Sequence, residues 1–137
     1  MFKRDTQIRF SHCDAAGVAF FPRLFDLLND ANEDWFAGPL GHSFRHLHLE
    51  ARLGVPTAHV DATFHAPLRL GDIIQQSVEL AALGASSCRL KHQIHRGDKL
   101  AAAFDQTLVC VSLDTFRPVA WPAPLRAALN AFQESHP

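Results

Sequence analysis

Several common functional signatures are missing from this sequence. Its three cysteines, Cys13, Cys88 and Cys110, are an odd number at wide spacing without a Cys-x-x-Cys pair, which indicates neither a zinc ribbon nor a disulfide framework. No GxGxxG, GxxxxGKS/T or GxSxG motif is present, so dinucleotide binding, P-loop chemistry and an α/β-hydrolase nucleophile elbow are unsupported. The formal net charge is −1 and there is no long basic run, which argues against nucleic acid as the main partner.

Long apolar segments are absent as well. The longest apolar run, from Ala15 to Phe21 with Gly17 inside it, is far shorter than the roughly 20 residues that a bilayer-spanning helix needs. The first ten residues, MFKRDTQIRF, lack the apolar core of a signal peptide. Together with the unpaired cysteines, these features predict a cytoplasmic protein with reduced thiols and no membrane partner.

The composition is that of a globular protein, with 47% hydrophobic and 20% charged residues. A chain of 137 residues corresponds to one domain, and it can bury roughly two-thirds of the surface that its unfolded form exposes. We therefore expect a single domain over residues 1–137, which needs neither a disulfide nor a structural metal to fold.

The predicted organisation is a strand, a long helix and then a series of strands. Alternation and β-branched residues predict strands over residues 3–10, 55–66, 73–83, 87–96 and 100–113. Helices are expected over residues 22–37, 44–53 and 122–132. Gly97-Asp98 is a favourable tight hairpin turn. This order predicts an α+β fold with a mostly antiparallel sheet, one face of which is covered by the long helix.

The long helix has clear start and stop signals. Pro22 suits the first helical turn, because the N–H that proline lacks has no partner there, and Gly38-Pro39 ends the segment. The residues predicted to form its apolar face are Leu24, Phe25, Leu28, Ala31 and Trp35.

The stretch FSHCDAAGVAFFP, residues 10–22, places a carboxylate directly before an apolar run. In one interpretation, Asp14 is a catalytic carboxylate, and free N–H groups at the following helix start bind a developing negative charge. The candidate donors are the amides of Phe21 and of residues 18–20, since Pro22 donates nothing. In the other interpretation, Asp14 caps a turn, which is a common role for aspartate. The spacing alone leaves both open.

Other polar residues give weaker signals. His12 and Cys13 are adjacent, and adjacent side chains of an extended segment point in opposite directions, so we do not expect a Cys–His dyad. His42, His46 and Glu50 would share a helix face, but there is no HExxH motif and a solvated face is the favoured interpretation. We predict no metal site.

His59 and His65 lie six residues apart on a presumed strand and so face the same way. One of them could line a pocket, and a partly buried, hydrogen-bonded histidine is the more common outcome.

The motif FSHCDAAGVAFFPRLFDLLNDANEDWF, taken with the order of elements, resembles the 4-hydroxybenzoyl-CoA thioesterase family of hotdog-fold proteins. The shared pattern is an Asp, a small residue or Pro, Ala-Gly, an apolar pair, an aromatic residue and a Pro that opens the central helix. The downstream segment FHAPLRLGD, residues 64–72, is similar to the strand–turn segment of that fold. The resemblance covers nearly the whole chain.

The resemblance implies a hotdog fold, in which an antiparallel sheet of about five strands wraps around the helix over residues 22–37. Two copies would pair edge to edge as a homodimer or assemble further into a homotetramer, with the active site between subunits. Asp14 would be the catalytic nucleophile or general base, and the backbone amide of Phe21 would polarise the thioester carbonyl. The residues predicted to bind substrate are Gly17, Val18, Phe20, Phe25, Asn29 and His65.

Two departures from the family pattern concern the substrate. Asn29 stands where the best-known aryl-CoA members carry an Asp that meets a ring hydroxyl, so the resemblance does not extend to a 4-hydroxy preference. The basic cluster that those members carry for the CoA phosphates is replaced by residues 84–87, GASS. Arg89, Lys91 or another subunit's Arg69 are the candidate substitutes.

The predicted function is hydrolysis of an acyl-CoA, aryl- or hydroxybenzoyl-type among the candidates, to a carboxylic acid and free CoA, without a metal or cofactor other than the CoA of the substrate. One alternative is a hotdog hydratase or dehydratase, which would need an Asp–His pair at or before the helix. The other is a non-catalytic acyl-CoA binding module.

Overall fold

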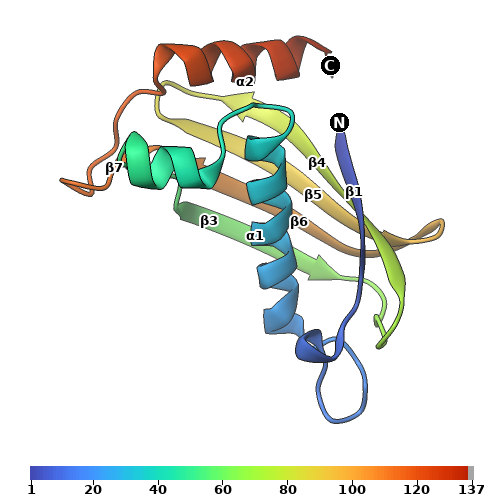
Figure 1. The fold of residues 1–137 in the computed structure, drawn as a ribbon. Helices are drawn as coiled ribbons and strands as arrows, with labels where there is room; N and C mark the ends of the chain where they lie inside the picture. Colours follow the sequence, from blue (N-terminus) through green and yellow to red (C-terminus); the bar gives the residue numbers. More distant parts are fainter. Residues whose placement is uncertain (136–137) are drawn as a thin grey trace.

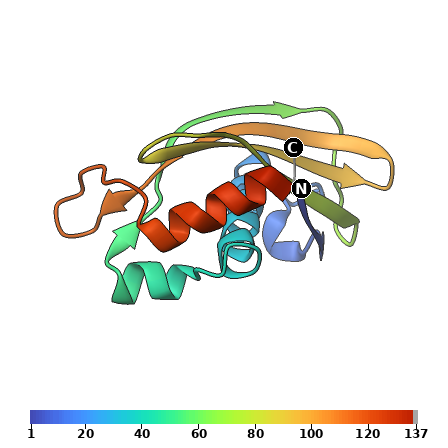
Figure 2. The ribbon, with the colours of Figure 1, turned by 90° about the horizontal axis from the view of Figure 1, so that it is seen from above.

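The computed structural model describes residues 1–135, which form one curved sheet with helices packed against it (Figure 1). The elements in chain order are β1 (Phe2–Gln7), η1 (Phe10–His12), α1 (Phe21–Ala37), η2 (His46–Glu50), β2 (Leu53–Gly54), β3 (Thr57–Phe64), β4 (Ile73–Leu83), β5 (Ser87–Arg96), β6 (Lys99–Val109), β7 (Val111–Ser112) and α2 (Ala123–Ser135). Figure 2 shows that α1 and α2 lie on the same side of the sheet.

The large sheet has five strands in the order β1-β4-β5-β6-β3, and every neighbouring pair is antiparallel. Strands β2 and β7 form a separate two-stranded sheet. The α+β architecture, the five-stranded antiparallel sheet and the long helix against it are therefore confirmed, and they make up the hotdog arrangement that the resemblance implied.

Strand β5 shows why the sheet could be predicted. Its residues alternate, with Cys88, Leu90, His92 and Ile94 buried and the residues between them mostly exposed. This alternation places one side of the strand against the helices and the other in solvent. The observed bounds of β4 and β5 are the predicted ones, and Gly97 has a φ of 62° in the turn before β6.

Helix α1 lies with one face on the sheet. Its buried residues are Leu24, Leu27, Leu28, Ala31, Asn32, Trp35 and Phe36. The five predicted residues all belong to the core or pack against it, but the predicted face was too narrow, because Leu27, Asn32 and Phe36 are buried as well. Phe25 is only half-buried, with its ring 5.6 Å from that of Phe104.

Three predicted elements differ most from the observed ones. The strand predicted over 100–113 is two strands, because the chain leaves the large sheet after Val109 and Val111–Ser112 pair with β2 instead. The helix predicted over 44–53 is much shorter, since Arg52 adopts a left-handed φ of 55° and ends it. The strand predicted over 3–10 ends at Gln7, and a 3-10 turn follows over Phe10–His12.

Buried polar side chains join α1 to the sheet. The Nδ2 of Asn32 donates to Oε1 of Gln106 at 2.9 Å, and Nε2 of Gln106 donates to Oγ1 of Thr57 at 2.8 Å. The Nε2 of Gln76 donates to the carbonyl of Leu27 at 2.9 Å. Because buried amides are costly to leave unpaired, these bonds hold α1, and with it the loop that precedes it, in one position over the sheet.

His92 belongs to the same buried layer and is only 2% exposed. Burial lowers the pKa of His92 to about 4, and the nearby Gln106 side chain opposes this shift to a smaller extent. Among the described residues, neither ring nitrogen has a partner at good hydrogen-bond geometry. The imidazole is therefore held in its neutral form in the fold at neutral pH.

The lowered pKa of His92 predicts a loss of stability in mild acid. An imidazole in the unfolded chain titrates near 6.5, so between pH 6.5 and about 4 only the unfolded state takes up this proton. The neutral His92 therefore makes its full contribution to the free energy of unfolding above about pH 6.5. This contribution is lost as the pH falls through the window. We expect the urea midpoint of the wild type to fall more steeply here than that of His92→Leu. Parallel curves for the two proteins would contradict the prediction.

Candidate active site

The loop between η1 and α1 carries Asp14 and projects beyond the N-terminal end of α1 (Figure 1). It folds back on itself: Cys13 lies opposite Ala19 in an antiparallel bridge, and the amide of Phe20 donates to the carbonyl of His12 at 2.8 Å. Gly17 sits in the bend with a φ of 75°, in the left-handed region that favours glycine. The Ala-Gly of the motif is thus the turn that returns the chain to the helix start.

The Asp14 carboxylate both stabilises this loop and keeps one oxygen free. Its Oδ1 accepts hydrogen bonds from the amides of Ala16 at 2.9 Å and Val18 at 3.3 Å. Within residues 1–135, no hydrogen bond or ion pair engages Oδ2. The turn-capping interpretation of Asp14 is therefore correct for one oxygen, and the exposed side chain retains a second oxygen for chemistry.

A distant segment holds the returning half of the loop. The amide of Ala19 donates to the carbonyl of Leu68 at 2.7 Å, and the amide of Leu70 donates to the carbonyl of Gly17 at 2.9 Å. Val18 lies opposite Arg69 in an antiparallel bridge. The two sequence motifs, residues 10–22 and 64–72, are therefore packed against each other, and the second one positions the first.

Several backbone donors around the start of α1 are already engaged. The amides of Val18, Ala19 and Phe20 are engaged by Asp14, Leu68 and His12, so the prediction that they are available donors was wrong. Pro22 has no N–H, and the amide of the residue after it donates to the carbonyl of Phe20 at 2.8 Å.

The Phe21 amide is the exception. In the part of the chain that the structure describes, it has no hydrogen-bond partner. An unpaired N–H at the first position of a 17-residue helix is a suitable donor to an anion or oxyanion.

A pocket of about 260 Å³ lies beside this helix start. Its lining residues are Ala19, Phe21, Leu24, Phe64, His65, Ala66, Pro67 and Leu68. The walls are mostly apolar, and the His65 imidazole is the polar side chain among them. The pocket thus brings together the end of the Asp14 loop, the first turn of α1 and the chain that leaves β3.

Aromatic rings run from this pocket into the core. The ring of Phe21 lies 5.8 Å from those of Phe20 and Phe64, and the ring of Phe64 lies 6.1 Å from that of Phe104. Phe20, Phe21 and Phe64 are 49%, 57% and 44% exposed. Aromatic rings that remain this exposed in a cluster mark a surface suited to an apolar or aromatic group.

The predicted substrate-binding residues are distributed unevenly around this pocket. His65 lines it, while Gly17, Val18 and Phe20 lie in the adjoining loop. Phe25 packs toward Phe104 and Asn29 is exposed on α1, and neither lines it. Their roles as site residues stay predictions.

Sequence reasoning missed Phe64 and the residues of the Ala66–Leu68 segment. The FHAPLRLGD motif carries the signal for them, since residues 64–68 of this motif line the pocket.

A model of the Thioesterase-like superfamily matches residues 8–129. The chain belongs to this family. Among its curated relatives, the 1,4-dihydroxy-2-naphthoyl-CoA hydrolase of Synechocystis sp. is 24% identical over 135 residues, which cover 93% of this chain and 94% of that protein. The hydrolase of the same name from Crocosphaera subtropica is 28% identical over 93 residues, or 68% of this chain and 67% of that protein.

Solved structures of thioesterases have the same fold as this member of the Thioesterase-like superfamily. A 1,4-dihydroxy-2-naphthoyl-CoA thioesterase from Synechocystis has a TM-score of 0.86 at 22% identity, covering 99% of this chain and 98% of its own. A gentisyl-coenzyme A thioesterase has a TM-score of 0.84 at 22% identity, covering 93% and 99%. A Staphylococcus aureus protein solved in complex with CoA has a TM-score of 0.89 at 15% identity, covering 99% and 85%.

At these identities the structural likeness shows the fold alone. Together with the family match and the curated relatives, it confirms the predicted family, the hotdog fold and the general class of thioester hydrolase.

The remaining polar candidates of this thioesterase-like chain form local contacts. The Nδ1 of His12 accepts from the amide of Arg9 at 2.9 Å, and His46 pairs with Glu50 at 2.7 Å. No group of three or more His, Cys, Asp and Glu side chains within residues 1–135 could hold a metal ion. Of the helices in this same range, none is long and apolar enough to cross a membrane.

Proposed function

We propose that this chain is an aryl-CoA thioesterase that uses Asp14 and the backbone amide of Phe21. The observation that supports it most is the arrangement of the Asp14 loop. A carboxylate with one unengaged oxygen and an unpaired helix-start N–H lie on the same loop and helix junction, next to an aromatic-lined pocket. These are the base or nucleophile, the oxyanion donor and the water-excluding wall that thioester hydrolysis needs.

In the proposed reaction, water and R–CO–S–CoA give R–COOH and CoA–SH. The Phe21 N–H donates to the thioester oxygen, which becomes negatively charged as the carbonyl carbon is attacked. The attacking group is either a water that gives its proton to Oδ2 of Asp14 or that oxygen itself, which would form an anhydride that water then hydrolyses. Collapse of the tetrahedral species expels the CoA thiolate, which takes up a proton.

The two forms of the reaction differ in the origin of the product oxygen. A single turnover in H₂¹⁸O puts the label in the acid if Asp14 is the general base. If Asp14 is the nucleophile and water attacks its carbonyl, the label enters Asp14 instead. In mass spectrometry, label in the Asp14 peptide shows the nucleophilic form, whereas label in the acid alone excludes water attack on the aspartyl carbonyl of an anhydride.

The aryl class of the acyl group is supported by the exposed rings at the pocket and by the relatives, which are named for naphthoyl and gentisyl thioesters. A panel of aryl-, short-chain and long-chain acyl-CoAs, with released thiol measured by a thiol-reactive dye, tests it. We expect kcat/KM to be at least about ten-fold higher for hydroxyaryl-CoAs, the scale of differences in apolar pocket fit. Equal or better turnover of alkyl thioesters would overturn the aryl assignment but not the hydrolase.

For the CoA phosphates we favour Arg69 of the same chain, in place of another subunit's Arg69. It is exposed and lies opposite Val18, next to the loop that carries Asp14. Arg89 is already paired with Asp105, at 3.6 Å. An arginine suits phosphate because its guanidinium can donate two parallel hydrogen bonds.

Assembly and location are part of the same proposal. Strand β3 is at the edge of the sheet, and an unpaired strand edge can add a strand of a second copy. We therefore propose a homodimer through β3, or a homotetramer built from such dimers, in the cytoplasm. The three free thiols are compatible with that compartment.

A hydratase or dehydratase is less well supported. The Nδ1 of His12, the histidine nearest to Asp14 in the sequence, accepts the Arg9 amide, and no hydrogen bond joins this ring to Asp14 in the described chain. The absorbance of an enoyl-CoA substrate, monitored beside thiol release, distinguishes the two reactions.

A further inference from the structure

A second pocket, of about 280 Å³, lies away from the Asp14 loop. We call it the His48 pocket. Its lining residues are Phe44, His48, Gly54, Val55, Pro56, Val111, Leu113 and Phe116. None of them lines the pocket beside Phe21. Because a cavity of about 150 Å³ holds benzene, this volume suits one or two fused rings and is too small for a CoA thioester.

The lining of the His48 pocket is apolar except for one imidazole. The Nδ1 of His48 lies 2.8 Å from the carbonyl oxygen of Phe44. A carbonyl can only accept, so Nδ1 carries the proton and Nε2 of the neutral ring is an acceptor. In the described part of the chain Nε2 has no partner, and it lies 3.8 Å from the position that a Cβ on Gly54 would occupy. The pocket wall shared by these two residues therefore presents one unpaired acceptor.

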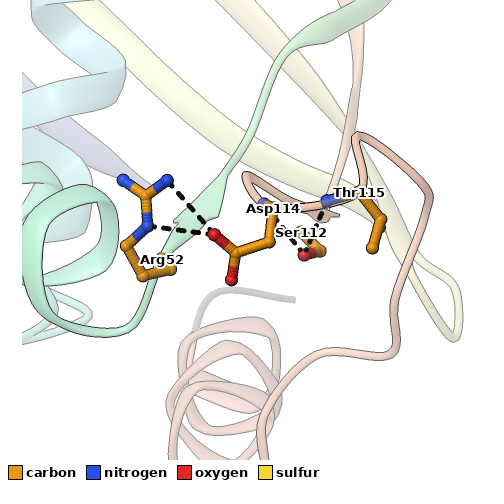
Figure 3. Close-up of polar contacts among 4 residues, drawn as sticks. All are labelled: Arg52, Ser112, Asp114 and Thr115. Carbon is orange, nitrogen blue, oxygen red and sulfur yellow. Dashed lines mark hydrogen bonds and ion pairs between the residues drawn. The ribbon is translucent and has the colours of Figure 1, made fainter.

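Polar contacts link the loop that forms the rim to itself and to Arg52. Arg52 is paired with Asp114 at 3.2 Å, and Oγ of Ser112 accepts from the amides of Asp114 and Thr115 (Figure 3). The amide of Phe116 donates to the carbonyl of Ser112 at 2.7 Å. The backbone and Ser112 hydrogen bonds therefore define the turn at the rim.

Phe116 at this rim combines backbone strain with exposure. It has a φ of 58°, which is unfavourable for a bulky residue, and its side chain is 76% exposed. Strain of this kind persists only where the surroundings impose it, and it is typical of binding sites. The loop thus keeps an exposed ring at the mouth of an apolar pocket.

We propose that the His48 pocket binds a hydroxylated aromatic ring, with the ring against the apolar wall and the hydroxyl donating to Nε2 of His48. The lining excludes a charged ligand group, because no lining residue is an acid, an arginine or a lysine. A flat apolar body with a single donor matches the one unpaired acceptor. A ring without a donor would cover this acceptor and leave it without a hydrogen bond, which would weaken binding. Binding here does not depend on the proposed hydrolysis.

The test compares 2-naphthol with 2-methoxynaphthalene, which has nearly the same shape but no donor. Titrations of the full chain at pH 8, followed by probe fluorescence, should give a Kd about five- to ten-fold lower for 2-naphthol, the scale of one hydrogen bond. His48→Leu should remove this difference between the probes. Phe116→Ala should raise the Kd of both probes by the same factor. Phe10→Ala, which alters a ring that is 80% exposed and lines neither pocket, is the matched control and should change neither Kd.

A second readout follows the His48 ring itself. The ¹⁵N resonance of Nε2 should shift on saturation with 2-naphthol and not with 2-methoxynaphthalene. Asp14→Asn should leave both Kd values unchanged. Equal affinity of the two probes for the wild type, or binding that is lost in Asp14→Asn but not in His48→Leu, would overturn the proposal.

Competition identifies the source of the ring. Displacement of 2-naphthol by a free, uncharged phenol indicates a separate small-molecule site. Displacement by the hydroxyaryl-CoA alone indicates that the pocket takes the acyl ring of a substrate.

Discussion

The Asp14→Asn substitution is expected to lower kcat for CoA-thioester hydrolysis by at least about 100-fold, the scale for losing a positioned catalytic base. The amide side chain keeps an oxygen that can accept from the amides of Ala16 and Val18, so the loop retains its turn. What the substitution removes is the negative charge and basicity of the oxygen that faces no protein donor. We therefore expect the loss in kcat with little change in the urea midpoint, measured by thiol release and by fluorescence.

A matched control separates the role of this carboxylate from a general change in charge. Asp26 is an exposed aspartate on the first half of α1, paired with Arg23 at 3.3 Å. Asp26→Asn makes the same chemical change and should retain nearly full activity, because exposed ion pairs of this type contribute little to stability. If Asp14→Asn hydrolyses every thioester as fast as Asp26→Asn, Asp14 is not the catalytic group.

The elements that the sequence predicted well are those whose pattern is local. β4 and β5 were predicted at their observed bounds because short turns delimit them, and in β5 apolar and polar residues also alternate. The strand predicted over 100–113 was wrong beyond Val109 because its last residues pair with Leu53–Gly54. That pairing joins positions nearly 60 residues apart, and nothing in the local pattern of 100–113 indicates it.

In the candidate site too, features with a local sequence signature were predicted, and features that depend on distant contacts were not. Asp14, Gly17 and Pro22 were identified from one contiguous motif, since a turn residue and a helix start have local signatures. The available N–H could not be chosen from the motif. Ala19 loses its donor to Leu68, about 50 residues further along the chain. Only the fold shows that Phe21 retains one.

The His48 pocket was invisible to sequence analysis for a different reason. Its acceptor exists because Nδ1 of His48 donates to the carbonyl of Phe44, and no role was assigned to His48 from the sequence. At the rim, Arg52 pairs with Asp114, a contact between segments 62 residues apart. The number of histidines in the sequence does not indicate a binding site. The acceptor at Nε2 follows from the tautomer that the Phe44 carbonyl imposes on His48.

The Phe21 amide can be tested by comparing Phe21→Pro with Phe21→Ala. Both variants lose the ring that lines the pocket, but only the proline loses the N–H. Proline suits this position, because it is the first residue of α1. The preceding residue, Phe20, already has a φ of −76° and a ψ of 122°, the region that a following proline requires. Since no described residue accepts from this amide, the substitution removes no hydrogen bond from the fold.

We expect kcat of Phe21→Pro to be about 100- to 1,000-fold below that of Phe21→Ala, which is the cost of removing one oxyanion donor. The KM values and urea midpoints of the two variants should be similar, because the donor strengthens its bond only as charge develops on the thioester oxygen. Phe21→Ala against the wild type reports the contribution of the ring to acyl binding. Equal kcat values for the alanine and proline variants would show that the oxyanion is stabilised elsewhere, even if Asp14 proves essential.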